Sequence, residues 1–211
     1  MTDAADSRTT NTGKGARKRN ELLDAAERVL LASGYAELSM RAVATEAGVR
    51  LGHLQYYFPA RSDLVAAVLD RTLGRSLDRL GPLLATSPHP AGPDPASLVR
   101  GLLADQDDPA LVRLFTELWA LAAVDTAVSD IVRAFYRGYG DQVVAHLRCR
   151  HPALPEAECR ARAEVFVMLI EGAALFRSGV AAHRAPQTDD LLVSTAVALL
   201  TDGHTAGAGQ V

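Results

Sequence analysis

Apolar residues recur every three or four positions along most of the chain, which is the spacing of one buried face of an α-helix. The helices that this pattern predicts cover about residues 18–33, 40–47, 50–57, 62–80, 96–104, 108–123, 126–149, 155–179 and 188–202. No stretch shows the alternation of apolar and polar residues that is typical of a strand. The pattern therefore predicts an all-α fold, and a hydrophobic content of 48% over 211 residues is enough for a substantial core.

Two short predicted helices, at 40–47 and 50–57, are separated by a sharp break at Gly48. Ser39 can accept a hydrogen bond from the free backbone N–H groups at the start of the first, and Gly48 suits the left-handed conformation in which many helices end. This is the sequence form of a helix-turn-helix, and the helix over 18–33 would complete a three-helix unit. An ordinary helical hairpin inside a larger bundle is the alternative.

The stretch from residue 38 to residue 58 resembles the DNA-binding half of the TetR family of bacterial repressors. The matching residues are Ser39, Arg41, Ala44, Ala47, Gly48, Val49, Gly52, Leu54, Tyr57, Phe58 and Arg61. The resemblance covers about residues 17–70, and the segment LQYYF resembles the betaine-regulator (BetI-like) branch. Arg50 and Gln55 depart from the usual pattern, so the DNA sequence preference cannot be copied from a relative.

The resemblance implies a domain order, and the residue pattern supplies the boundaries. We expect a disordered basic arm at 1–17, a helix-turn-helix domain at 18–61, a connecting helix at 62–80, and a ligand-binding and dimerisation domain at 81–205. The last of these domains begins with the segment GPLLATSPHPAGPDP, residues 81–95, whose five prolines predict a loop.

Contacts with double-stranded DNA are expected from the second short helix and from basic residues around it. Arg50, His53, Gln55 and Tyr56 would read bases, whereas the others would position the protein, mostly on phosphates. The full set of candidates is Lys14, Arg17, Lys18, Arg19, Ser39, Arg41, Arg50, Leu51, His53, Gln55, Tyr56, Tyr57 and Arg61. Because the net charge of the chain is −3, positive charge must be local; residues 1–60 carry eight Lys/Arg and seven Asp/Glu, a net +1.

Most aromatic side chains outside the DNA-binding unit lie in the last two thirds of the chain. They are Phe115, Trp119, Phe135, Tyr136, Tyr139 and Phe166. Small-molecule sites combine apolar walls with a few polar groups, so these residues predict a pocket for an unknown effector, with Glu117 as one polar group. An aromatic cage would suit a cationic or quaternary amine. Plain core packing is the alternative.

Residues 165–176, VFVMLIEGAALF, are apolar nearly all round the predicted helix, which therefore needs to be buried on two sides. One side would face its own bundle, and the other would face a second copy of the chain. The residues predicted at this homodimer interface are Phe166, Ile170, Ala173, Leu192, Ala196 and Leu199. The alternative is that both helices belong wholly to the intramolecular core. A dimer would place two recognition helices about 34 Å apart, as a palindromic operator requires.

Other classes of protein are disfavoured. The chain has no glycine-rich phosphate loop and no nucleophile elbow, so we expect neither an enzyme nor a cofactor. His146, Cys149, His151 and Cys159 match no zinc-site spacing, so no metal is expected. The N-terminus lacks the apolar core of a signal peptide, and no apolar run approaches the roughly 18 residues of a membrane span, which predicts a cytoplasmic protein without a membrane partner.

The combined hypothesis is a ligand-responsive transcriptional repressor that binds a palindromic operator as a homodimer and is released by a small molecule. The alternative is a helical dimer that binds small molecules or proteins and has no sequence-specific DNA binding.

Overall fold

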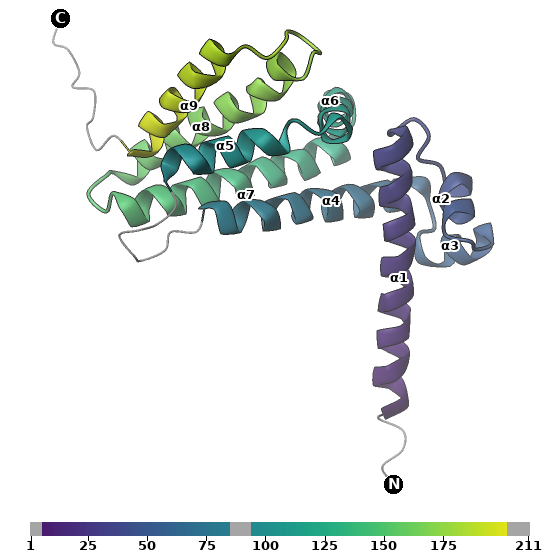
Figure 1. The fold of residues 1–211 in the computed structure, drawn as a ribbon. Coiled ribbons are helices and arrows are strands. Elements are labelled where there is room, and N and C mark those ends of the chain that lie inside the picture. Colours follow the sequence, from purple (N-terminus) through teal and green to yellow (C-terminus); the bar gives the residue numbers. More distant parts are fainter. Residues whose placement is uncertain (1–5, 85–93, 202–211) are drawn as a thin grey trace, which may run out of the picture. The chain divides into compact units, whose positions relative to one another are not determined.

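The computed structural model describes residues 6–84 and 94–201. The helices in these ranges are α1 (Asp6–Ser33), α2 (Met40–Glu46), α3 (Leu51–Tyr57), α4 (Arg61–Leu84), α5 (Pro95–Asp105), α6 (Pro109–Ala122), α7 (Thr126–Arg150), α8 (Glu156–Arg177) and α9 (Pro186–Thr201) (Figure 1). The predicted all-α fold is confirmed. None of these helices combines the length and the apolar character that crossing a bilayer requires.

The chain forms two compact units. The first unit contains the residues up to Leu73 together with Arg113–Ile131, and the second contains Gly74–Val112 and the residues from Val132 onward. Helices α4, α6 and α7 each continue from one unit into the other. Arg113 and Glu117 of α6 form hydrogen bonds with Leu31 and Tyr35, and all four residues lie in the first unit. The sequence-based boundaries, in contrast, assigned all of 81–205 to a separate domain.

The first unit has its core between α1, α2, α3 and the start of α4. Its wholly buried residues include Leu22, Leu23, Leu30, Leu38, Leu54 and Leu64. The Ser39 side chain accepts the N–H of Ala42 at 3.2 Å, as a helix cap does. Gly48 ends the second helix with φ +65°, a conformation that favours glycine. The predicted helix-turn-helix is thereby confirmed in its local geometry.

Helix α1 begins at Asp6, well before the predicted start near residue 18, so residues 6–17 of the expected disordered arm are helical. No apolar stripe in the sequence predicts a helix there. An existing helix can nevertheless be extended, because each added residue gains a hydrogen bond and the cost of starting a helix is not repeated. Ion pairs of Arg17 and Lys18 with Glu21, at 3.4 and 3.0 Å, also lie along this part of the helix. Residues 1–5 of the expected arm lie outside the described residues.

Helix α4 continues to Leu84, although Gly81 and Pro82 predicted its end near residue 80. A proline inside a helix costs about 3 kcal/mol, and the burial of a leucine side chain returns a similar amount. Leu84 is 3% exposed and belongs to the core of the second unit, and its carbonyl oxygen accepts a hydrogen bond from Nδ1 of His146 at 2.8 Å. These contacts hold the last turn of α4 in place.

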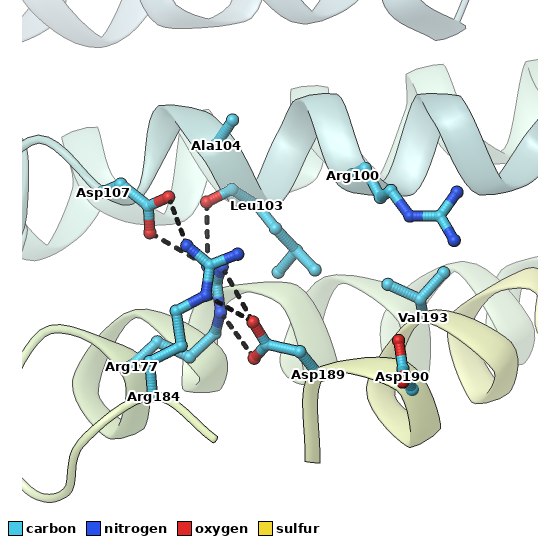
Figure 2. A pocket seen from close by; sticks show the side chains of 9 residues that line it. All are labelled: Arg100, Leu103, Ala104, Asp107, Arg177, Arg184, Asp189, Asp190 and Val193. Carbon is cyan, nitrogen blue, oxygen red and sulfur yellow. Dashed lines mark hydrogen bonds and ion pairs between the residues drawn. The ribbon is translucent and has the colours of Figure 1, made fainter. Parts of the chain in front are cut away.

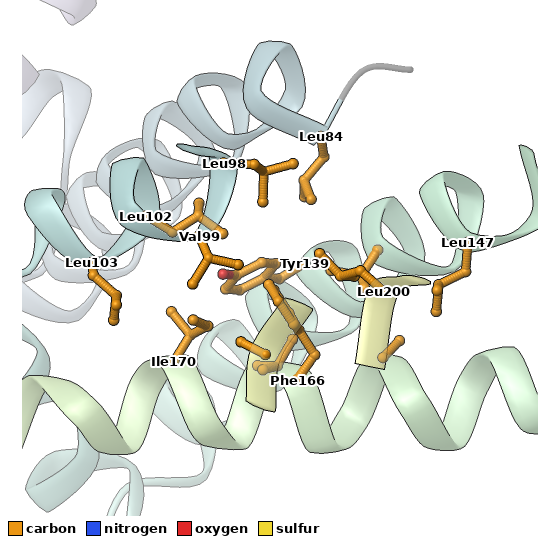
Figure 3. Close-up of a cluster of buried hydrophobic side chains, with 14 of the residues drawn as sticks. Leu84, Leu98, Val99, Leu102, Leu103, Tyr139, Leu147, Phe166, Ile170 and Leu200 are labelled. Carbon is orange, nitrogen blue, oxygen red and sulfur yellow. The ribbon is translucent and has the colours of Figure 1, made fainter. Parts of the chain in front are cut away.

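The second unit is built around helices α5, α7, α8 and α9. Its core contains Tyr139, Phe166, Ile170, Leu102 and Leu200, all with exposed fractions of 2% or less (Figure 3). Helix α5 begins where the carboxylate of Asp94 accepts the N–H groups of Ala96 and Ser97. The last helix, α9, packs against α8 and α5 (Figure 1). A single core therefore holds the helices of this unit together.

Candidate nucleic-acid interface

Helix α3 presents polar side chains on one face and an apolar anchor on the other. Leu54 is fully buried, whereas His53, Gln55 and Tyr56 are exposed, Tyr56 by 80%. Arg50 stands before the first turn in an extended conformation, is exposed, and makes no capping hydrogen bond. These four side chains, which the sequence predicted to read bases, therefore lie together at the surface of the first unit.

Tyr57 is half-buried and lies between two of these side chains. Its ring stands edge-on to that of Tyr56, with centroids 5.1 Å apart, and tilted against that of His53 at 5.6 Å. Leu51, another candidate, is also half-buried. Both side chains are therefore less accessible than the other candidates on α3.

The remaining candidates in the motif divide into two kinds. Arg41 is exposed on α2. The Arg61 guanidinium, in contrast, donates to the carbonyl oxygen of Leu38 at 2.9 Å and to the hydroxyl of Tyr35 at 3.2 Å. The donors expected on DNA phosphates are thus used to brace the turn between α1 and α2. The Ser39 hydroxyl is likewise engaged, as the cap of α2.

The basic residues of α1 are partly neutralised. Arg17 and Lys18 both pair with Glu21, and the hydrogen bond from Lys18, followed by its charge, lowers the pKa of Glu21. The Arg19 guanidinium lies 5.0 Å from the ring centroid of Phe58, at the end of α3. Lys14 is exposed. The cluster that the sequence suggested as a free arm is therefore part of a helical surface.

Several ion pairs that fix the first unit were not found from the sequence. Arg71 on α4 bonds to Asp24 and, at 3.0 Å, to Glu27 on α1, and it also reaches the carbonyl oxygen of Asn20. Arg28 on α1 pairs with Glu46 on α2 at 2.6 Å. These partners are 18 or more residues apart in sequence, so no local sequence pattern predicts the ion pairs.

The predicted effector residues divide between the two units. Phe115 and Trp119 belong to the first, with ring centroids 6.4 Å apart. The other four belong to the second, and of these Tyr139 and Phe166 are core residues, as the alternative of plain packing expected. Glu117 was expected beside a pocket, but its carboxylate accepts the N–H of Tyr35 at 2.6 Å. A pocket formed by the six aromatic residues stays a prediction.

Glu171 is a candidate that sequence analysis passed over. Its carboxylate accepts the hydroxyl of Tyr136 at 2.9 Å, linking α8 to α7. Burial raises the pKa of Glu171 to about 7, against the smaller lowering effect of the Tyr136 hydrogen bond. The sequence did indicate an unusual carboxyl group here, because Glu171 is the one charged residue between Val165 and Phe176.

The residues predicted at the dimer interface differ in how deeply their own chain buries them, and the interface itself stays a prediction. Phe166, Ile170, Ala173 and Ala196 are buried in the core of their own chain, and Leu192 and Leu199 are half-buried. They follow the apolar pattern, but the pattern could not tell which apolar side faces inward. The apolar residues left outward are Val165, Met168 and Phe176 on α8 and Leu191 on α9, exposed by 49, 68, 60 and 68%.

The four residues considered as metal ligands have other surroundings. His146 bonds to the carbonyl oxygen of Leu84, and Nε2 of His151 bonds to that of Leu200 at 2.9 Å. Cys159 is buried and Cys149 is exposed. In the described part of the chain, no three His, Cys, Asp or Glu side chains are grouped as metal ligands.

A small pocket in the second unit is lined in part by side chains that form ion pairs with one another (Figure 2). Its volume is about 170 Å³. Arg177, with a side chain only 5% exposed, bonds to Asp189 at 3.0 Å and to the carbonyl oxygen of Leu103 at 2.8 Å. Arg184 bridges Asp189 and Asp107 at 2.5 and 3.0 Å. The geometry ties the connection between α8 and α9 to the end of α5.

Over part of its length, the chain is similar to known bacterial transcription regulators. Residues 22–68 match the family model described as bacterial regulatory proteins, tetR family. The chain is 30% identical over 135 residues to an uncharacterized HTH-type transcriptional regulator in the dhlA 5′ region of Xanthobacter autotrophicus, covering 62% of this chain and 65% of that protein. It is 31% identical over 147 residues to the HTH-type transcriptional repressor KstR of Rhodococcus jostii, covering 64% and 65%.

The chain thus spans just under two thirds of the length of each of these relatives. Among solved structures, it is similar to the multidrug binding protein EbrR complexed with proflavin, with a TM-score of 0.62, 25% identity, and coverage of 86% of this chain and 98% of that one. None of these three proteins is named as a betaine regulator, so the BetI-like branch stays a prediction.

Proposed function

Because the chain belongs to the TetR family of bacterial regulatory proteins, we propose that it regulates transcription by binding double-stranded DNA as a homodimer and is released from DNA by a small molecule. The observation that carries the proposal is the outer face of α3, where Arg50, His53, Gln55 and Tyr56 are exposed opposite the buried Leu54. A short helix anchored by an apolar residue and carrying hydrogen-bonding groups outward is suited to a DNA major groove.

Within this proposal, the polar and basic side chains have different roles. Arg50 and Gln55 can form paired hydrogen bonds with guanine and adenine edges, respectively. Arg41 and Lys14 contact phosphates, and Arg61 holds the turn before α2 so that the motif keeps its shape. The regulator would act in the cytoplasm, where bacterial DNA is found.

The homodimer is supported by an unpartnered apolar stripe. Val165, Met168 and Phe176 are spaced by three and eleven positions along α8, which places them on one side of the helix. Leu191 adds an exposed apolar residue on the helix that packs beside it. A twofold dimer formed through this stripe would present two α3 helices to a palindromic operator.

The repressor and effector parts of the proposal rest on relatives and on one carboxyl group. KstR is named as a repressor, and EbrR is named as a multidrug binding protein and was solved with proflavin, a cationic aromatic dye. Glu171, half-buried next to Tyr136, gains a counter-charge when a cation binds beside it. We therefore expect a cationic or basic aromatic effector.

Selection of duplexes from a random pool tests the DNA-binding part. The full chain should enrich an inverted repeat, and affinity should fall steeply as salt is raised. His53→Ala should relax base preference without changing the salt dependence, whereas Val124→Ala, an exposed residue in the turn after α6, should change neither. If no duplex is enriched and binding is weak and indifferent to the variants, the alternative of a helical dimer without DNA recognition is favoured.

The effector part is tested by titrating the protein with proflavin and following dye fluorescence. We expect Glu171→Gln to weaken binding by about tenfold, since it removes the carboxylate that pairs with the cation. Glu164→Gln is the matched control, because Glu164 is an exposed glutamate on the same helix. Equal affinity in all three proteins would show that Glu171 takes no part in binding this dye.

A further inference from the structure

One side of α5 forms a wall of the small pocket in the second unit (Figure 2). Its residues Arg100, Leu103, Ala104 and Asp107 are spaced by one, three or four positions, so they lie along the same side of the helix. Helix α9 packs against α5 and contributes Asp190 to the pocket lining. All of these residues belong to the second unit, so the pocket is formed within it.

Four of the charged side chains around the pocket are paired with one another. Arg177 pairs with Asp107 at 3.4 Å and with Asp189 at 3.0 Å. Arg184 pairs with the same two carboxylates, at 3.0 and 2.5 Å. Because each cation meets both anions, the four side chains form a closed ring without net charge. We call this set of contacts the ion-pair ring.

Two further charged side chains line the pocket outside the ion-pair ring. They are Arg100 on α5 and Asp190 on α9, and both are exposed. Within residues 6–84 and 94–201, neither side chain forms a hydrogen bond or an ion pair, with the other or with a third residue. Figure 2 shows both away from the ion-pair ring, at the end of the pocket where Val193 lies. The pocket therefore offers a ligand one cation and one anion.

The size and the apolar lining of the pocket limit the ligand further. The volume is about 170 Å³, whereas a protein cavity of about 150 Å³ is known to hold benzene. A ligand of about six to eight non-hydrogen atoms is therefore accommodated. Leu103 and Val193, which are 3% and 8% exposed, add apolar surface beside the two charges. A short hydrocarbon group fits this surface.

We propose that this pocket binds a small zwitterionic amino acid. The ligand carboxylate accepts hydrogen bonds from the guanidinium of Arg100, and the ligand ammonium group donates to the carboxylate of Asp190. The hydrocarbon part lies against Val193. A ligand with a single charge leaves either Arg100 or Asp190 without a partner, so the pocket discriminates against it.

The proposed amino-acid site is separate from the sites described above. Its lining residues include neither Glu171 nor any of the six aromatic residues predicted to bind an effector, and none of them lies on α3. The proposal therefore stands independently of DNA binding and of the effector assigned to Glu171.

Calorimetric titration of the full chain with L-valine and with δ-aminovalerate tests the proposal. The two compounds are isomers of suitable size that differ in the separation of their charges, and at least one should bind with a dissociation constant of about 1 mM or lower. The matching compounds with one charged group are isovalerate and isobutylamine for valine, and valerate and butylamine for δ-aminovalerate. Each should bind at least about tenfold more weakly.

Substitutions at the two unpaired charges test the location of the site. Arg100→Met and Asp190→Asn should each weaken binding of the zwitterion by at least about tenfold. Both side chains are exposed and outside the ion-pair ring, so the variants should keep the circular dichroism spectrum of wild type. Arg137→Met and Glu164→Gln are matched controls, because these exposed residues of α7 and α8 do not line the pocket, and they should bind as wild type does.

Methyl resonances observed by NMR give a second measure of location. Those of Val193 should shift when the zwitterion is added, whereas those of Val124, in the turn after α6, should not.

Three results would overturn the proposal. They are no binding of either zwitterion at about 10 mM, equal binding of a compound with one charge, and binding that both Arg100→Met and Asp190→Asn leave unchanged. Because no DNA enters these experiments, failure of the proposed amino-acid site leaves the proposed function standing, and the reverse also holds.

Discussion

The guanidinium of Arg61 lies over the ring of Tyr35, 4.8 Å from its centroid, and so joins the first residue of α4 to the turn after α1. The same group donates to the carbonyl oxygen of Leu38, which leads into α2. A position that the resemblance assigned to phosphate contact is thus engaged in holding three helices of the first unit together.

Arg61→Ala should therefore lower the free energy of unfolding by about 1 kcal/mol, through the lost hydrogen bond and cation–π contact. Urea unfolding followed by circular dichroism measures this. In DNA binding, the variant should keep the wild-type salt dependence, whereas Arg41→Ala should reduce the slope of log affinity against log salt by about one. The reverse pattern would return Arg61 to the phosphate contacts.

Arg177→Met should destabilise the second unit by about 3 kcal/mol, because it leaves the largely buried Asp189 with fewer partners and removes a donor from the end of α5. Arg184→Met is the matched control. Its side chain is 57% exposed, so solvent screens its ion pairs and the loss of stability should be clearly smaller than that of Arg177→Met. Thermal unfolding of both variants separates the two cases, and equal losses would contradict the importance of burial.

Met168→Glu should convert the proposed dimer into a monomer, because it places a charge in the centre of the exposed apolar stripe of α8. Light scattering coupled to gel filtration measures the mass. Val124→Glu alters an apolar residue that is even more exposed, by 84%, but lies in the turn after α6, and it should leave the mass unchanged. A monomeric wild type would remove the dimer from the proposal.

Glu171 should make stability depend on pH. Burial raises its pKa from 4.5 to about 7, so the folded chain binds a proton at pH values where the unfolded chain has lost it. Stability should therefore fall as the pH rises from about 4.5 through about 7, by roughly 3 kcal/mol. Denaturant unfolding at several pH values should show this decline in wild type and not in Glu171→Gln. An equal decline in both proteins would assign it to other groups.

The sequence predicted those parts of the fold whose causes are local. Ser39 as a cap and Gly48 as a helix end are set by residues a few positions away, and both are found as expected. The outward position of His53 also follows from the spacing around Leu54. Helix ends decided by distant contacts were predicted less well, as α4 shows, because Leu84 is held by a histidine 62 residues further along.

The candidate site was predicted in the same uneven way. The exposed face of α3 could be inferred from periodicity, but the partners of Arg61 and Glu117 could not, since Glu117 meets a backbone group 82 residues away. For α8, an apolar residue on every side left its orientation undetermined. Phe166 was predicted at the interface with a second copy of the chain, whereas its side chain is buried in the core of its own chain.

The ion pairs around Arg177 have a consequence for the length of the chain between α8 and α9. Arg177 stands at the end of α8 and Asp189 in the first turn of α9, so their contact closes the connecting loop at its base. Once the ends of a loop are held together, each doubling of its length costs only about 0.6 kcal/mol in closure entropy. Val180, exposed by 61%, is therefore a position where an inserted peptide tag or a fluorescent group can be carried while the helices on either side keep their places.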